Sequence, residues 1–219
     1  MKLFVWDFHG VLERGNDHAV TEITNVILKR FGYSRQMSME ESELLAGRRW
    51  NEYFTHLLPE VNHDECKKLQ SACVDMANSQ PDLILSYVRL NDHADHVLSE
   101  IHNSPFTQIL ISNTMPTVLD WYVKNLGVEK YFPSTHRFGV DNHQKQGFTK
   151  KECLEDFLKE KHFPHGMISI GDSPGDMNLT QLHPQGVGYM YSHPGRAHRP
   201  AECHHKISDL RHVLKEVSV

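Results

Sequence analysis

Short apolar runs that each end in a polar cluster, with helix-period segments between them, constrain the fold of this chain most strongly. The clearest run, residues 2–6, ends in Asp7-Phe8-His9-Gly10, the pattern of a buried strand followed by a turn. We expect further strands at 109–111, 167–170 and 187–191, and a weaker one around Phe138. We expect helices at 97–102, 118–126, 151–161, 177–182 and 210–217. Strands that alternate with helices predict an α/β fold, a three-layer Rossmann-like core with a mainly parallel sheet.

The stretch from residue 15 to residue 87 has helical periodicity and no useful strand pattern. Its apolar positions fall on helix faces: Val20, Ile23, Ile27 and Phe31, then Leu44 and Leu45, then Trp50, Phe54 and Leu57. Ser38-Met39-Glu40-Glu41 has the pattern of a capping box that opens one helix. We therefore predict an all-helical domain at 15–87, inserted into a core made of 1–14 and 88–219.

Composition narrows the class of protein. The 219 residues carry 23 Lys and Arg against 28 Asp and Glu, a net charge of −5, which argues against nucleic acid or an anionic membrane as a partner. No apolar run reaches the roughly 18 residues of a spanning helix, and Asp7 interrupts the N-terminal run too early for a signal peptide. Four scattered cysteines without a CxxC pair predict neither disulfides nor a cysteine zinc site. We expect a cytoplasmic protein, and we assign most of its 17 histidines to the surface.

Carboxylates follow two of the predicted strands. Asp7 follows the first strand, and Asp172 and Asp176 lie in Gly171-Asp172-Ser173-Pro174-Gly175-Asp176 after the strand at 167–170. Ligands of such sheets bind beyond the carboxyl ends of the strands, so the three side chains should converge. Carboxylates that converge repel one another unless a hard cation lies between them, and Mg²⁺ suits such oxygen ligands.

Groups suited to an anion occupy neighbouring positions. Ser112 and Asn113 follow the strand at 109–111 and offer a hydroxyl and an amide. Lys150 lies in Thr149-Lys150-Lys151-Glu152, the pattern of a capping box that would place this lysine at a helix start. Lys145 is an alternative for the same role. A cation, an anion pocket and a strand-end carboxylate together suggest phosphoryl transfer through an aspartyl-phosphate.

Four segments in order resemble the haloacid dehalogenase-like superfamily: Asp7-Phe8-His9-Gly10-Val11, Ile111-Ser112-Asn113-Thr114, Lys150, and the acidic segment from Gly171 to Asp176. The resemblance implies Asp7 as nucleophile and phosphate binding by Ser112 and the groups that follow it. It implies Mg²⁺ held by Asp7, the His9 carbonyl and Asp172, with Asp176 in support. It also implies that the helical stretch is a cap domain, whose Gly47-Arg48-Arg49-Trp50 segment would present Arg48 and Arg49 to a substrate.

His9 departs from the family pattern, because the phosphatases that the chain resembles have a second aspartate at this position as acid and base. Imidazole can exchange protons near neutral pH, so a phosphatase acting on a small phosphorylated metabolite is the favoured interpretation. A weak or inactive phosphate-binding regulator is the alternative. A phosphonate-cleaving enzyme would need a cap lysine, for which Lys29, Lys67 and Lys68 are candidates without a motif, and the acidic fourth segment argues against a dehalogenase.

The run at 192–205, rich in His, Pro and Arg, has the composition of a loop. It follows the last expected strand, so it should leave the sheet on the same side as the polar clusters. Arg196 and Arg199 would then approach a substrate.

Overall fold

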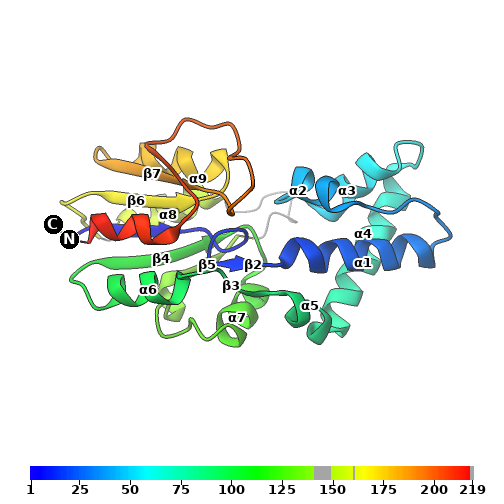
Figure 1. Ribbon diagram of the computed structural model, residues 1–219, viewed down its shortest axis with the longest axis horizontal. Helices are drawn as coiled ribbons and strands as arrows, with labels where there is room; N and C mark the ends of the chain where they lie inside the picture. The colour runs from blue at the N-terminus through cyan, green and yellow to red at the C-terminus, as the bar shows by residue number, and fades with distance from the viewer. Residues whose placement is uncertain (141–148, 160, 218–219) are drawn as a thin grey trace. The chain divides into compact units, whose positions relative to one another are not determined.

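The computed structural model describes residues 1–140, 149–159 and 161–217, and the chain divides into two compact units (Figure 1). The first unit joins Met1–Glu13 to Leu90–Val219, and the second is Arg14–Arg89. A short ladder of β2 (Glu13–Arg14) and β3 (Arg89–Leu90) lies where the chain leaves and re-enters the first unit. None of the described helices combines the length and hydrophobicity needed to cross a bilayer.

The first unit is built on one parallel sheet with the strand order β5-β4-β1-β6-β7-β8. Its strands are β1 (Leu3–Trp6), β4 (Thr107–Ser112), β5 (Arg137–Gly139), β6 (Met167–Gly171), β7 (Gly186–Tyr191) and β8 (His205–Ile207). The predicted α/β class and the five predicted strands are confirmed. The first strand in the chain is central, flanked by β4 and β6, so the crevice at which such folds bind ligands opens at the carboxyl end of β1.

Both faces of this sheet are buried. Side chains alternate along a strand, and Leu3 and Val5 share a cluster with Cys153 and Leu154 of α8 (Lys150–Lys159). Phe4 and Trp6 therefore face the opposite side, where they are completely buried as well. This burial on both faces explains why the strand reads as a continuous apolar run rather than an alternating one.

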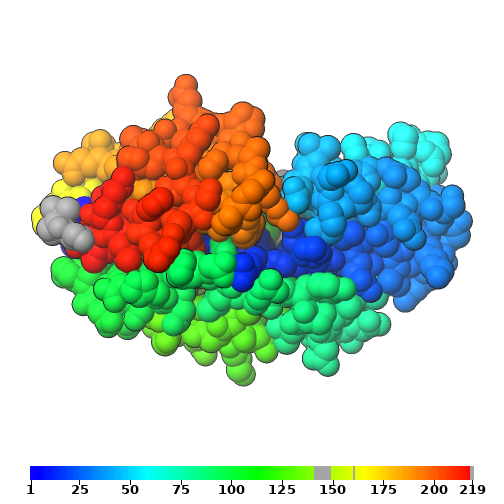
Figure 2. Space-filling view, in the orientation of Figure 1, coloured from blue at the N-terminus to red at the C-terminus, as the bar shows by residue number. Residues whose placement is uncertain are grey.

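The remaining helices of this unit are α6 (Ala94–His102), α7 (Pro116–Asn125), α9 (Pro174–Asn178) and three 3₁₀ segments, η1 (Ser134–His136), η2 (Leu179–Leu182) and η3 (Leu210–Glu216). The C-terminal η3 packs on α6, and the two segments lie side by side in Figures 1 and 2. Three expectations need correction. The helix expected at 210–217 is a 3₁₀ helix, and most of the helix expected at 177–182 is the 3₁₀ segment η2, because α9 ends at Asn178. The run at 192–205 does not end as a loop, because His205 begins β8.

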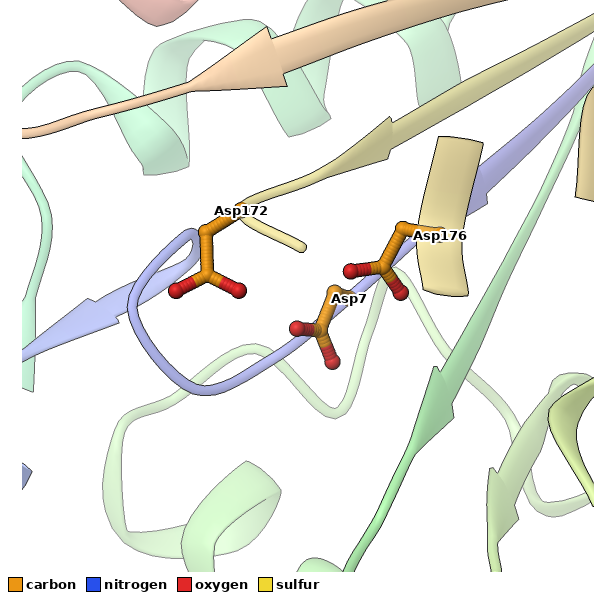
Figure 3. Close-up of side chains that lie close together, drawn as sticks. All are labelled: Asp7, Asp172 and Asp176. Carbon is orange, nitrogen blue, oxygen red and sulfur yellow. The ribbon is translucent and has the colours of Figure 1, made fainter. Parts of the chain in front are cut away.

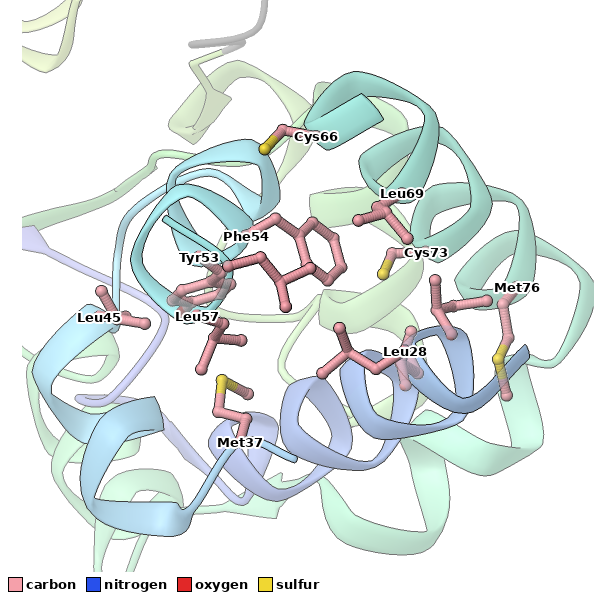
Figure 4. Close-up of a cluster of buried hydrophobic side chains, with 13 residues drawn as sticks. Leu28, Met37, Leu45, Tyr53, Phe54, Leu57, Cys66, Leu69, Cys73 and Met76 are labelled. Carbon is pink, nitrogen blue, oxygen red and sulfur yellow. The ribbon is translucent and has the colours of Figure 1, made fainter. Parts of the chain in front are cut away.

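The second unit contains α1 (Asn16–Arg30), α2 (Met39–Leu45), α3 (Trp50–Leu57), α4 (His63–Ser79) and α5 (Pro81–Tyr87). These helices enclose a core of their own (Figure 4), made of Ile23, Ile27, Leu28, Met37, Leu45, Tyr53, Phe54, Leu57, Leu58, Cys66, Leu69, Cys73 and Met76. The capping box at Ser38 is confirmed by reciprocal hydrogen bonds with Glu41.

Two of the apolar residues assigned to helix faces of this unit are exposed. Phe31 is 39% exposed because α1 ends at Arg30 and Phe31 is already its C-cap. Leu44 is 64% exposed, since the adjacent Leu45 is the residue of this pair that α2 turns into the core.

Candidate active site

Three carboxylates converge at the carboxyl end of the central strands (Figure 3). Asp7 follows β1, Asp172 follows β6, and Asp176 lies in α9. One oxygen from each lies within 4.8 Å of the others, so the structure brings together the three aspartates predicted from the sequence. Their mutual distance is short enough for one cation to contact all three.

Asp7 is buried and held by one of its two oxygens. Its Oδ1 accepts the Phe8 amide at 2.8 Å and the Lys150 ammonium at 2.7 Å. Within the described ranges, Oδ2 receives no hydrogen bond from the protein. Burial is the main cause that raises the pKa of Asp7 to about 7. The charges of Asp176 and Asp172 raise this pKa further, and Lys150 offsets only part of the increase. The carboxylate is thus fixed in place, and its charge is incompletely balanced.

Lys150 joins Asp7 to Asp176. It begins α8, and Thr149 and Glu152 form the predicted capping box at that helix start. The ammonium donates to Asp7 Oδ1 and Asp176 Oδ1 at 2.7 Å each. Burial lowers the pKa of Lys150, but Asp176 and Asp7 outweigh this effect and the pKa is raised, so the lysine stays charged. The alternative lysine, Lys145, lies outside the described residues.

Asp176 is fixed from its other side as well. Its Oδ2 accepts the Ser173 amide at 3.2 Å and the Ser173 hydroxyl at 2.5 Å. Gly171 makes this position possible, because a Cβ there would lie 2.1 Å from the Cβ of Asp176. Both oxygens of Asp176 therefore serve to hold Lys150 and the start of α9 in place.

Asp172 lies at the rim and is 24% exposed. A Cβ on Gly10 would come within 2.9 Å of its Oδ2, and Gly10 has the positive φ of 77° that favours glycine. Burial raises the pKa of Asp172, and Arg199, Lys150 and His9 act in the opposite direction. Arg199 Nη2 is 3.8 Å from Asp172 Oδ2, so one of the two arginines expected to approach the substrate site reaches the cluster.

The two predicted anion-binding residues differ in their exposure to solvent. Ser112 is the last residue of β4 and is fully buried, and its Oγ has no hydrogen-bond partner among the described residues. A buried hydroxyl without a partner is uncommon, and it points to a ligand atom that would complete its bonding. Asn113 is exposed in the loop that follows.

His9 is also at the carboxyl end of β1, with its side chain 28% exposed. Its Nδ1 lies 2.9 Å from Oε1 of Glu13, which is almost completely buried. The sequence reasoning missed Glu13, although a carboxylate four positions after His9 across a glycine turn was a visible signal. It also missed Ser173, whose bonds to Asp176 are those of a capping box.

Arg48 and Arg49 belong to the second unit. Arg48 is exposed, and the backbone amide of Arg49 donates to Glu52 Oε2 at 3.0 Å at the start of α3. Both residues are described within that unit alone.

A family model for haloacid dehalogenase-like hydrolases matches residues 4–182, which is well over half of the chain. The chain belongs to this family. The match spans all four of the segments on which the resemblance rested. The sequence has no detectable match among curated proteins.

Solved structures share the fold of this haloacid dehalogenase-like hydrolase over nearly its whole length. A phosphatase candidate from Clostridium difficile has a TM-score of 0.79 at 10% identity, covering 98% of this chain and 97% of its own. A haloacid dehalogenase-like family hydrolase from Streptococcus pneumoniae has a TM-score of 0.76 at 12% identity, with coverages of 97% and 96%. A family hydrolase from Deinococcus radiodurans, solved with bound phosphate and sodium, has a TM-score of 0.70 at 13% identity, with coverages of 99% and 96%.

Proposed function

We propose that this protein is a Mg²⁺-dependent phosphatase that hydrolyses a small phosphorylated metabolite through an aspartyl-phosphate on Asp7. The observation that carries the proposal is the setting of Asp7, a buried carboxylate with one oxygen held by Phe8 and Lys150 and the other without a donor in the described part of the chain. A nucleophile needs one oxygen free and a fixed orientation, and this arrangement supplies both. The phosphate bound to the Deinococcus radiodurans relative is in keeping with the proposal.

The aspartate cluster fits a divalent metal ion. When all three carboxyl groups are ionised they carry three negative charges, and Lys150 compensates one of them at hydrogen-bond distance. The donor atoms are hard oxygens, which Mg²⁺ prefers. Asp7, Asp172 and the His9 carbonyl would hold the ion, with Asp176 in support. When bound, Mg²⁺ would neutralise charge on the phosphoryl oxygens and make the phosphorus easier to attack.

The chain's own residues account for the remaining chemistry. An Asp7 oxygen attacks phosphorus, the bond to the ester oxygen breaks, and His9 donates a proton to that leaving oxygen. Water then attacks the phosphorus of the aspartyl-phosphate and gives a proton to His9. The bond to Asp7 breaks, its electron pair returns to the carboxylate, and inorganic phosphate leaves. Lys150 and Ser112 would stabilise the phosphoryl oxygens during both steps, and Asn113 would donate to them from the adjoining loop.

The helical unit would act as a cap that excludes water and selects the substrate, as the family resemblance implies. Arg48 and Arg49 would bind a carboxylate or a second phosphate of the substrate. The exposed position of Arg48 leaves its guanidinium available for such a ligand. The candidate Schiff-base lysines Lys29, Lys67 and Lys68 are all exposed, without the burial that activates a lysine amine, which favours phosphate esters over phosphonates.

A non-catalytic phosphate-binding protein is the second candidate, and His9 is the observation that favours it. If the imidazole contributes only its backbone carbonyl to the metal, the pocket would bind phosphate without hydrolysing the phosphoenzyme. General acid–base help is worth about 10²–10⁴-fold, so such a protein would turn over at a small fraction of the rate of a phosphatase.

The test is hydrolysis of a generic aryl phosphate with and without Mg²⁺ by the wild type, Asp7→Asn and Asp156→Asn. Asp156 is an exposed residue of α8 and serves as the matched control. We expect turnover that requires Mg²⁺, is abolished in Asp7→Asn and is retained in Asp156→Asn. Activity that survives in Asp7→Asn would contradict the mechanism. A wild type that binds inorganic phosphate but does not turn over would establish the second candidate.

A further inference from the structure

The loop after β1 folds back onto its own beginning. The Phe8 carbonyl accepts the amides of Val11 at 3.3 Å, Leu12 at 3.0 Å and Glu13 at 3.2 Å. Gly10, with its positive φ of 77°, allows the chain to reverse within this short segment. His9 and Glu13 pair as an isolated bridge as a result, so a residue four positions away returns to the histidine.

The contact between these two side chains is well defined. His9 Nδ1 lies 2.9 Å from Glu13 Oε1, and the Glu13 side chain is 1% exposed. The same oxygen accepts the Gly10 amide at 3.2 Å. Because a backbone amide can only donate, Oε1 acts as an acceptor in the contact with Gly10. The same acceptor oxygen faces His9 Nδ1, an arrangement that matches a hydrogen on Nδ1 and leaves Nε2 for proton exchange.

Aromatic rings fix the plane of the imidazole. Phe8 lies 5.2 Å from it at an interplanar angle of 78°, and Tyr122 of α7 lies 5.2 Å from it at 85°. Both are edge-on contacts, a favourable geometry for aromatic pairs. With Nδ1 bonded to Glu13, the ring is restrained in its tautomer and its orientation.

We propose that Glu13 is a positioning residue for His9, holding the imidazole so that Nε2 exchanges the proton with the leaving group and with water. The inference rests on the proposed function, because it concerns the acid–base step at the Asp7 site. Carboxylates that orient a histidine through Nδ1 are a recurrent device in enzymes, and the loop geometry supplies the same device here. His9, which stands where the family's phosphatases have an aspartate, and Glu13 then work together as a histidine–carboxylate pair.

The kinetic test compares Glu13→Leu, Glu13→Gln and the control Glu100→Leu, an exposed residue of α6. We expect Glu13→Leu to lower kcat by about 10- to 100-fold, the usual effect of losing a group that orients a functional histidine, with KM changed much less. Glu13→Gln keeps an acceptor oxygen and should recover most of that loss. In a His9→Ala background, Glu13→Leu should cause no further loss of kcat, because there is no imidazole left to orient.

Three results would overturn the inference. Wild-type kcat in Glu13→Leu would show that His9 needs no orientation, and a higher kcat would show that Glu13 holds His9 away from the reaction. An equal loss in the wild-type and His9→Ala backgrounds would assign Glu13 a merely structural role.

The tautomer of His9 provides a readout that does not depend on turnover. In ¹⁵N NMR spectra of the wild type, with the His9 signals identified by their loss in His9→Ala, we expect the Nδ1–H form. The Nε2–H form would overturn the inference, whether or not Glu13→Leu folds. If the wild type is inert towards aryl phosphates, the proposed function fails separately, and the tautomer alone decides whether Glu13 orients His9.

Discussion

Replacing Lys150 with methionine removes an ammonium that contacts two buried carboxylates, while keeping a side chain of similar length. The ammonium is 2.7 Å from both Asp7 and Asp176, and the three side chains are 10%, 9% and 3% exposed. Breaking a buried pair by removing one partner costs about 3–5 kcal/mol, against about 0.2–1 kcal/mol for an exposed pair. Because all three side chains are buried, the larger cost applies. We therefore expect the free energy of unfolding of the metal-free protein to fall by about 3–5 kcal/mol at pH 8.

The loss should be smaller at pH 6. Burial already raises the pKa of Asp7 to about 7, and removing Lys150 takes away the contact that holds it down. The folded protein then binds a proton that the unfolded chain, with an aspartate pKa near 3.9, does not bind in this range. Above pH 7 the Asp7 carboxyl of the wild type loses this proton, whereas Lys150→Met keeps it to a higher pH at a cost in stability that grows as the pH rises. The gap in stability between the two proteins therefore widens above pH 7 and is smaller below it, where Asp7 is protonated in both.

Urea denaturation, followed by circular dichroism and by hydrogen exchange in β1 and α8, measures this loss in the first unit. The matched control is Lys151→Met, because Lys151 is adjacent, 67% exposed, and 3.8 Å from Glu155; we expect a change within about 0.5 kcal/mol. Added Mg²⁺ should narrow the gap between Lys150→Met and the wild type, since the ion supplies positive charge to the same carboxylates. A loss below about 1 kcal/mol at pH 8, or an equal loss at both pH values, would refute the reasoning.

Three further substitutions test other parts of the structure. Gly171→Ala places a Cβ 2.1 Å from the Asp176 Cβ, so it should destabilise the first unit by about 1–3 kcal/mol in urea denaturation and lower the hydrolysis of aryl phosphate. Gly175→Ala is the matched control: its Cβ would lie 3.6 Å from the nearest atom, so neither stability nor activity should change. Ser112→Ala should leave the melting temperature unchanged, because its hydroxyl has no partner among the described residues, yet lower kcat/KM for an aryl phosphate by about tenfold or more, the effect of one bond to a charged ligand. Phe54→Ala should cost the second unit about 3–5 kcal/mol, measured as faster hydrogen exchange in α3 and α4, because Phe54 is fully buried in that core.

The sheet could be predicted because its strands are buried on both faces and read as continuous apolar runs. Each run also ends at residues that cannot continue it, such as Asp7 after β1 and Asp172 after β6. The short strand β8 could not be predicted, since His205-Lys206-Ile207 has one buried apolar residue and takes its structure from pairing with β7. Tertiary contacts, rather than local preference, create such an edge strand.

Much of the candidate site followed from the rule that ligands bind at the carboxyl ends of parallel strands. Asp7, Asp172 and Asp176 converge as that rule requires, and the capping box at Thr149 placed Lys150 at a helix start. The bonds that fix these groups could not be read from spacing. The close approach of Gly171 to Asp176 depends on backbone positions to within an ångström, as does the lack of a described partner for the buried Ser112 hydroxyl.

The contact with Glu13 changes the interpretation of the histidine at position 9. From the sequence alone, the position shows the loss of an aspartate, and that loss favours a weak enzyme or a phosphate-binding protein. In the structure, the imidazole at position 9 is bonded at 2.9 Å to a carboxylate that is almost fully buried. Restoring aspartate by His9→Asp would set two carboxylates against each other at this point, and buried like charges repel. The single substitution therefore cannot report what an aspartate would do here, and the fair comparison is His9→Asp combined with Glu13→Gln, which removes the opposing charge while keeping an acceptor for the Gly10 amide.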